Sequence, residues 1–446
     1  MDKKEIQGFS KLPKEQKLQW LADNYFSDKE QAAKELSSYW HRYPETQKLF
    51  DEFAENTISN FYMPFGVAPN FLINGRIYAV PMVIEESSVV AAASMSAKQW
   101  LERGGFHAEV IDTEKIGQVH FLWQGEKAKL DRFFAAIKPK LFEETESITA
   151  NMQQRGGGIL GVDLVDLTEQ MPDYYQVKAR FETCDSMGAN FINSVLEKFA
   201  AILKREASQW SEFEGDEKQV EIIMSILSNY TPNCLVRAWV SCKVAEMDCF
   251  VKDMDGPTFV RKFSNGVRIA QVDPYRATTH NKGIFNGIDA VVLATGNDFR
   301  AVEACGHVYA GRNGQYSSLT NIDIQDGQFT YTLEVPLSLG TVGGLTTLHP
   351  MVRRGLEMLG NPSARELMMI AASVGLANNF SAVRSLVTVG IQKGHMKMHL
   401  LNILKNFEAS EQETELAKKY FVHNIVSYTS VREFLELLRS GQTVKL

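Results

Sequence analysis

The chain has few cysteines, and none of them form a pair spaced to bind metal. Its five cysteines are an odd number among 446 residues, and no two are arranged as C-x-x-C. This pattern argues against a disulfide framework and against a zinc knuckle. It favours a reducing compartment, so we expect a cytoplasmic protein without a metal centre.

Long apolar runs are also missing. The first residues, MDKKEIQGFSKLPKEQK, lack the apolar core of a signal peptide. The longest apolar stretches, such as 89–93 and 288–294, are far shorter than the ~20 residues that span a bilayer. We therefore expect no membrane anchor.

The chain has no excess of positive charge. It carries 47 lysines and arginines against 54 acidic residues, a net charge of -7. A general nucleic-acid binder would show a basic field, so we expect no nucleic-acid partner. A local basic pocket for an anionic ligand remains compatible with this balance.

The length predicts two or three domains, and the hydrophobic pattern predicts mixed α and β structure. Apolar residues at helical spacing predict helices over 13–55, near 126–138, over 184–206 and through most of the chain beyond 375. Strand-like runs lie at 57–84, where Asn74-Gly75 predicts a hairpin turn, and within 106–182 and 234–251. The apolar run at 289–296 predicts a further, buried strand.

The first polar cluster that could carry chemistry is Glu85-Glu86-Ser87-Ser88, which lies between two apolar segments. Acidic and hydroxyl side chains are typical of a helix N-terminus, which is the simpler interpretation. The functional interpretation is a carboxylate held in a cleft, where it donates a proton.

The second cluster, 273–298, crowds polar side chains around glycines and ends in Gly296-Asn297-Asp298. It contains Arg276, His280, Asn281, Lys282 and Asn286. A turn with surface charges would explain it structurally. Functionally, a lysine in a pocket can stabilise a developing oxyanion, and a nearby aspartate can tune that lysine.

The third cluster, 185–190, opens a strongly amphipathic helix. Backbone N–H groups at a helix N-terminus attract phosphate, and Gly188 would let a pyrophosphate approach closely. No G-x-G-x-x-G follows a strand, so a Rossmann domain is not supported. Arg155 with the glycines at 156–158 is a weaker candidate, and either segment could be an ordinary loop-to-helix junction.

The fourth cluster, 390–399, places His395 beside Gly394. Such a histidine on a mobile segment could protonate a leaving group. His395 and His399 are also spaced i, i+4 like a metal pair, but no third ligand is evident and no H-E-x-x-H motif occurs. We therefore expect no metal.

Several segments, in order from about residue 50 to 405, resemble the class II, bacterial-type 3-hydroxy-3-methylglutaryl-CoA (HMG-CoA) reductases. They are ENTISN (55–60), VPMVIEESSVVAAAS (80–94), RGGG (155–158), DSMGAN (185–190), DPYRATTHNKGIFNGIDAVVLATGND (273–298), GTVGG (340–344), GNPSAREL (360–367) and GIQKGHMKMH (390–399). The 273–298 block is long and close, which makes chance similarity very improbable.

The resemblance implies an enzyme that reduces HMG-CoA to mevalonate with two hydrides from NADPH or NADH, or runs the reverse oxidation, with CoA released. It implies these catalytic residues: Glu86, Lys282, Asp298 and His395. It implies these substrate contacts: Ser88, Arg276 and Asn286. It implies these cofactor contacts: Asp185, Met187, Gly188, Ala189 and Asn190.

The roles carried over are specific. Lys282 would stabilise the oxyanion of the first reduction, and Asp298 would hold that lysine. His395 would protonate the departing CoA thiolate, and Glu86 would assist proton transfer during the second reduction.

The resemblance also implies an α/β (α+β) architecture. A large mixed α/β substrate domain would contain residues 1–113 and 231–385, with a small ferredoxin-like nucleotide-binding domain inserted at 114–230 and a C-terminal helical flap at 386–446. It further implies a homodimer or a higher even oligomer that builds its site at the subunit interface.

Three departures from the family pattern fall at backbone-sensitive places. Ser87 replaces the usual proline after the glutamate pair, ENTIS replaces ENVIG or ENVVG, and DSMGAN replaces DAMGAN. None removes a reacting group, so we expect activity. Two alternatives remain: a CoA-thioester transferase or lyase that uses no nicotinamide cofactor, and a non-catalytic CoA-binding homologue.

Overall fold

The computed structural model describes residues 5–251, 254–388, 400–422 and 424–440. The chain divides into two compact units, Met1–Pro64 and Phe65–Leu446. The domain boundaries expected at 113/114, 230/231 and 385/386 stay predictions.

The first unit is helical, as the pattern over 13–55 predicted. Its helices are α1 (Lys14–Tyr25), α2 (Lys29–Ser38) and α3 (Pro44–Asp51). The ENTIS segment folds back onto them, because the indole N–H of Trp40 donates to the Ile58 carbonyl at 2.8 Å. Ser59, where the family has glycine, donates its hydroxyl to the Leu36 carbonyl at 2.5 Å. The departure at this position therefore adds a hydrogen bond within the unit.

The second unit begins with a two-stranded hairpin, β1 (Phe65–Ile73) and β2 (Arg76–Val83). Asn74 and Gly75 form its turn with φ of 48° and 83°, which confirms the predicted N-G turn. Helix α4 (Ser87–Leu101) follows, with Glu86 at its N-cap position and Ser87 as its first residue. The acidic and hydroxyl-rich segment thus does start a helix, although the Glu86 side chain makes no capping hydrogen bond.

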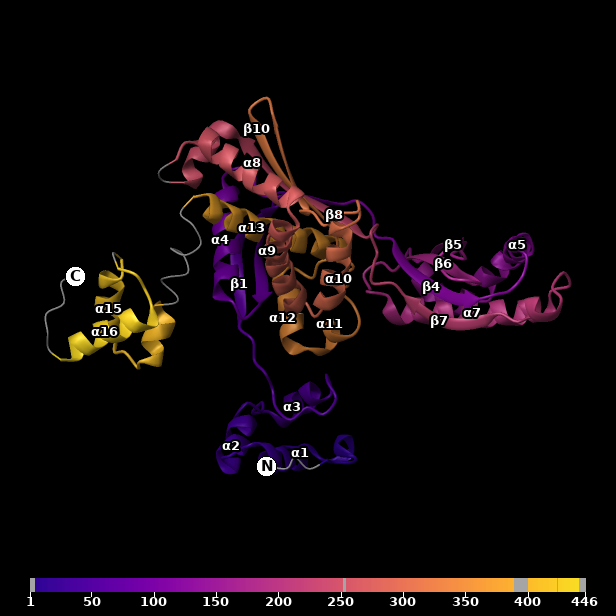
Figure 1. Cartoon of the computed structure of the whole chain (residues 1–446), viewed down its shortest axis with the longest axis horizontal. Helices are drawn as coiled ribbons and strands as arrows, with labels where there is room; N and C mark the ends of the chain where they lie inside the picture. The colour runs from indigo at the N-terminus through magenta and orange to yellow at the C-terminus, as the bar shows by residue number, and fades with distance from the viewer. Residues whose placement is uncertain (1–4, 252–253, 389–399, 423, 441–446) are drawn as a thin grey trace. The chain divides into compact units, whose positions relative to one another are not determined.

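The main sheet has the strand order β3-β8-β10-β9, all antiparallel. Its strands are β3 (His107–Val110), β8 (Leu235–Lys243), β9 (Thr320–Gln325) and β10 (Gln328–Pro336). The helices of this region are α8 (Gly256–Val272), α9 (Pro274–Ala294), α10 (Phe299–Ala310), α11 (Leu345–Leu348), α12 (Pro350–Met358) and α13 (Ala364–Val387). Figure 1 shows α9 and α13 in the middle of this body, where one apolar core joins them to the sheet.

The buried strand predicted at 289–296 was wrong, because these residues complete helix α9 and its C-terminal turn. Ile288, Ala290, Val291 and Val292 are all fully buried. A helix enclosed on nearly all sides shows a continuous apolar run, which periodicity alone cannot distinguish from a buried strand.

Helix α13 is the one helix among the described residues that is long and apolar enough to span a membrane. Of its most apolar window, 83% is buried inside the molecule. Its hydrophobicity is therefore explained by its place in the core.

A second four-stranded antiparallel sheet has the order β5-β6-β4-β7. Its elements follow the chain as β4 (Lys115–Leu122), α5 (Lys127–Glu143), α6 (Glu146–Gln153), β5 (Gly158–Asp166), β6 (Tyr174–Glu182), α7 (Ala189–Gln209) and β7 (Glu221–Leu227). Apart from the short α6, this βαββαβ order confirms the expected ferredoxin-like fold. It has its own apolar core between the sheet and helices α5 and α7 (Figure 1).

The C-terminal helices α15 (Glu411–Tyr420) and α16 (Tyr428–Arg439) pack on each other around a small core of their own. Each begins with a serine capping box, at Ser410 and Ser427. Such boxes satisfy two exposed N–H groups at a helix start. The helical prediction for the end of the chain is therefore confirmed for the described residues.

Candidate active site

Two of the candidate catalytic residues meet although they lie almost 200 positions apart in the sequence. Lys282 Nζ, on α9, is 3.9 Å from Glu86 Oε2, at the start of α4. The Ser88 hydroxyl donates to the other carboxylate oxygen, Glu86 Oε1. This bond leaves Oε2 facing the ammonium group. The lysine side chain is 64% exposed and the glutamate 39%, so the pair is open to a ligand on this face.

Helix α9 arranges the polar residues of the 273–298 cluster on two faces. Asn286 lies one turn beyond Lys282, so both side chains project from the same side of the helix. Arg276 lies six residues before Lys282 and is half-buried, and this burial lowers its pKa. The arginine remains protonated at any physiological pH.

His280 and Asn281 lie on the buried side of α9 and serve as its anchors. His280 Nε2 is 2.7 Å from the Thr320 hydroxyl, and the His280 carbonyl accepts from the Asn379 amide at 2.8 Å. Asn281 donates to the Ser317 carbonyl and accepts from the Leu319 N–H. Burial, together with the charge of Arg276, lowers the pKa of His280 to about 3. The histidine is therefore neutral, and its place points to a structural role.

The 185–190 loop opens helix α7, and its first residue is fixed by two hydrogen bonds. The Asp185 carboxylate accepts from the Ala364 N–H at 2.7 Å, and the Asp185 carbonyl accepts from the Thr341 N–H at 2.8 Å. Gly188 is the N-cap of α7 with φ of 83°, and a Cβ there would lie 2.4 Å from the Thr183 side chain. Only glycine fits this position without strain.

A pocket of about 750 Å³ lies in front of this loop. Met187, Gly188, Ala189 and Asn190 line it together with Asp298 and residues of the 340–344 segment. The free N–H groups at the start of a 21-residue helix, a glycine that permits close approach, and this volume together suit the pyrophosphate of a dinucleotide.

Within the single chain, Asp298 contacts its own helix start and Arg300, so its expected contact with Lys282 stays a prediction. It caps helix α10 by accepting from the Arg300 and Ala301 N–H groups at 3.0 and 3.2 Å, and it forms an ion pair with Arg300 at 2.9 Å. Partial burial acts to raise the pKa of Asp298, but the hydrogen bonds from Arg300 and Ala301 outweigh it, so the pKa is lowered. The carboxylate is therefore ionised beside this pocket.

The length of α9 explains why Lys282 and Asp298 are apart. Lys282 lies 12 residues before the end of the helix at Ala294, and Asp298 follows that end. At 1.5 Å per residue, the helix alone separates them by about 18 Å. Within one chain, Glu86 and Lys282 thus form one cluster, and Asp298 with the 185–190 loop forms another.

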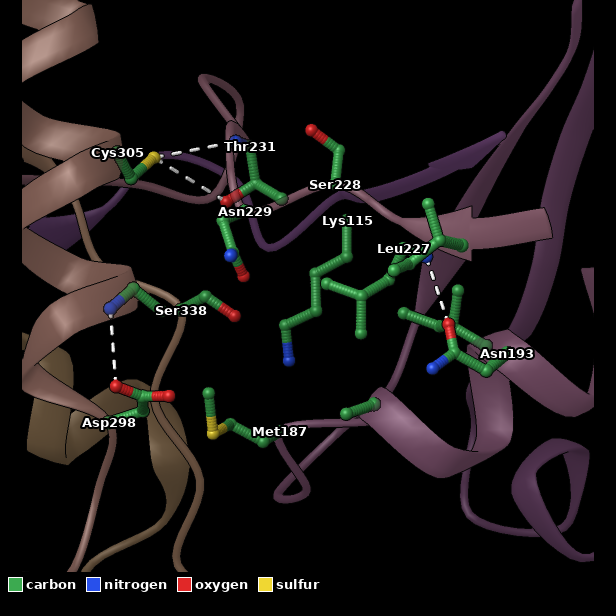
Figure 2. Close-up of a pocket in the computed structure, with 14 residues that line it drawn as sticks. Lys115, Met187, Asn193, Leu227, Ser228, Asn229, Thr231, Asp298, Cys305 and Ser338 are labelled. Carbon is green, nitrogen blue, oxygen red and sulfur yellow. Dashed lines mark hydrogen bonds between the residues drawn. The ribbon is translucent and has the colours of Figure 1, made fainter. Parts of the chain in front are cut away.

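Sequence reasoning missed Lys115, which lines a neighbouring pocket of about 270 Å³ together with Met187, Asn193 and Asp298 (Figure 2). Its ammonium donates to the Thr183 hydroxyl and, at 2.9 Å, to the Ser186 carbonyl. The residue is only 4% exposed, and burial lowers its pKa. Following Asp112 and Glu114 in the sequence, this lysine looks like a surface charge, and no local signal marks it as buried.

The fourth polar cluster, 390–399, was the last candidate from the sequence. His395, Gly390 and Gly394 lie outside the described residues. Within the described part of the chain, no group of three or more histidine, cysteine or acidic side chains is placed to hold a metal.

Comparisons with known proteins agree on one family. The model for hydroxymethylglutaryl-coenzyme A reductase matches residues 14–400. The 3-hydroxy-3-methylglutaryl-coenzyme A reductase of Archaeoglobus fulgidus is 34% identical over 440 residues, covering 98% of this chain and 95% of that protein. A probable reductase of the same name from Borreliella burgdorferi is 33% identical over 350 residues, covering 78% and 77%. A solved class II reductase of Streptococcus pneumoniae, bound to NADPH in open conformations, is 35% identical with a TM-score of 0.70, covering 89% of this chain and 96% of that one.

Proposed function

Because residues 14–400 match its family model, the chain belongs to the hydroxymethylglutaryl-coenzyme A reductase family, and we propose that it interconverts HMG-CoA and mevalonate with NADPH or NADH. The observation that carries this proposal is the Glu86–Lys282 pair, with Asn286 on the same helix face. A cation and a carboxylate held together in this way can polarise a carbonyl and move a proton at its oxygen. The family places the reaction in the mevalonate pathway, and the thiols of Cys184, Cys234 and Cys305, which are in no disulfide, support a cytoplasmic location.

The chemistry of the site follows from these side chains. When bound, a reduced nicotinamide dinucleotide would supply one hydride, so the two reductions would use two cofactor molecules in succession. Lys282 donates to the thioester oxygen and stabilises the negative charge that develops there. Glu86 holds the ammonium in place and exchanges a proton with the substrate oxygen in the second reduction. We assign protonation of the CoA thiolate to His395 and recognition of a substrate carboxylate or phosphate to Arg276.

We further propose that two copies of the chain complete each site. The Glu86–Lys282 cluster and the Asp298–loop cluster are separated by the length of α9, whereas hydride transfer needs the substrate and the cofactor in contact. Glu86 and Lys282 from one subunit would then face Asp298 and the dinucleotide loop of the other. A homodimer is the smallest assembly that provides this arrangement.

The exposure of the Glu86–Lys282 pair also supports a site that a second subunit completes. An ion pair whose lysine is 64% exposed gains little energy in water and stabilises an oxyanion poorly. Covering it with a second subunit would exclude water and strengthen the electrostatic interaction.

The test is a steady-state assay with HMG-CoA and either cofactor, and with mevalonate and CoA in the reverse direction. We expect the wild-type chain to consume reduced cofactor, seen as a loss of its absorbance band when HMG-CoA is added. Lys282→Ala should lower turnover at least ~100-fold, because it removes the oxyanion donor. Lys262→Ala, at an exposed lysine on α8, should leave turnover unchanged.

Three outcomes would contradict the proposal. Near-normal turnover in Lys282→Ala would remove the lysine from the mechanism. HMG-CoA consumption without cofactor oxidation would favour the transferase or lyase alternative. Tight CoA binding without any turnover would indicate a non-catalytic homologue.

A further inference from the structure

The segment 184–188, which leads into helix α7, has an unusual backbone. Cys184 has φ of 50° and Gly188 has φ of 83°, so two residues within five adopt the left-handed conformation. For a non-glycine residue such as Cys184 this conformation is strained. It persists only where the surrounding contacts fix the chain.

Three of the side chains that fix this segment are charged. The Glu182 carboxylate accepts from the Cys184 N–H at 2.7 Å, and the Asp185 carboxylate accepts from the start of α13. The third is Lys115, at the first position of β4, whose ammonium donates to the Thr183 hydroxyl and the Ser186 carbonyl. Lys115 thereby ties the strand entering the ferredoxin-like domain to the segment that precedes α7.

We propose that Lys115 is a positioning residue for the nicotinamide dinucleotide: its ammonium holds residues 183–186 in the conformation that presents the start of α7 to the cofactor. Figure 2 shows the lysine side chain reaching between Met187 and Ser338 into the pocket that Asp298 also lines. The inference rests on the proposed function. It adds a residue that acts on cofactor binding through the loop.

The positive charge of Lys115, like its hydrogen bonds, should favour cofactor binding. A buried cation is costly and is kept where it has a role or is well paired. Here the ammonium group lies 2.9 Å from the Ser186 carbonyl, two residues before Gly188, the N-cap of the helix whose first N–H groups would receive a pyrophosphate. Low-dielectric surroundings strengthen its attraction for that anion.

The loss of this lysine should not unfold the protein. The Thr183 hydroxyl also donates to the Ser186 carbonyl at 2.7 Å, so these two groups keep each other as partners in its absence. Methionine has nearly the same length and suits an apolar environment. Lys115→Met therefore removes a buried charge without leaving the loop groups unpaired.

The test measures NADPH binding and turnover in the full-length enzyme. For Lys115→Met we expect the KM for NADPH, and the dissociation constant from NADPH fluorescence, to rise about ten- to hundredfold, the effect of losing charged hydrogen bonds that organise a site. The KM for HMG-CoA should stay within about twofold, and Tm should be unchanged or higher. Lys115→Arg, which keeps the charge and the donors, should restore most of the NADPH affinity.

A matched control lies in the same domain. Lys129 forms an ion pair with Glu217 at 2.8 Å, away from the loop, and Lys129→Met should leave both KM values unchanged. The inference is overturned if Lys115→Met binds NADPH as the wild type does. It is equally overturned if both KM values and Tm change together, because that indicates general loss of structure. A wild-type chain that oxidises neither cofactor with HMG-CoA would instead overturn the proposed function.

Discussion

Gly188 has a backbone conformation and a neighbour that both exclude a side chain. Gly188→Ala should lower Tm and raise the KM for NADPH, because it adds the cost of a left-handed alanine, ~1–2 kcal/mol, to a clash 2.4 Å from Thr183. The measurement is a thermal melt together with cofactor kinetics.

Gly156 supplies the control for this substitution. Its φ is 91°, but a Cβ there would meet nothing within 4 Å. Gly156→Ala should therefore show the cost of the backbone strain alone. Equal losses of stability in the two variants would show that the contact with Thr183 is unimportant.

The buried histidine of α9 makes stability depend on pH. The pKa of His280 is lowered by burial to about 3, whereas an unfolded histidine titrates near 6.5. The unfolded chain therefore binds the proton first, so His280 contributes stability above pH ~6.5 that is lost as pH falls toward 3. Tm measured from pH 8 to pH 5 should fall less steeply in His280→Gln than in the wild type. Parallel curves would contradict this origin.

At the scale of elements, two glycines one turn apart on α9 face different neighbours. A Cβ on Gly287 would lie 2.6 Å from the Val374 carbonyl oxygen of α13, whereas a Cβ on Gly283 would meet only Asn379, at 3.6 Å. Gly287→Ala should destabilise the protein by ~1–3 kcal/mol, because it forces the two helices apart. Gly283→Ala should stabilise it by ~0.5–1 kcal/mol, because alanine is the better helix former. Thermal melts distinguish the two, and a stabilising Gly287→Ala would show that α9 and α13 adjust easily.

Element types were largely predictable from the sequence where one face of an element is buried. The N-G turn at 74–75, the helix after Glu86 and the strands of the ferredoxin-like domain all follow from local patterns. The end of α9 was not predictable, because it is buried on nearly all sides and so loses its helical periodicity. The side-chain environment of Lys115 and the pairing of Asp298 with Arg300 depend on tertiary contacts that no local pattern encodes.

At the scale of the whole molecule, shared sites predict complementation between inactive subunits. Lys282→Ala and Asp298→Ala should each be inactive alone. If each site takes Lys282 from one subunit and Asp298 from the other, a mixed dimer contains one intact site. Random reassociation makes about half of the dimers mixed, so activity should recover to about a quarter of the wild-type value. No recovery after verified subunit exchange would place the whole site within one chain.

The ferredoxin-like domain is inserted between two strands that are direct neighbours in the main sheet. Val110 of β3 pairs with Val236 of β8, and the Leu235 N–H donates to the Asp112 carbonyl at 3.0 Å. The more than 100 residues between them thus occupy the place of a tight hairpin turn, where long insertions cost little. The pairing of β3 with β8 therefore does not depend on what the inserted residues form. If the insert binds the cofactor as proposed, changes in cofactor preference can accordingly arise there without altering the main sheet.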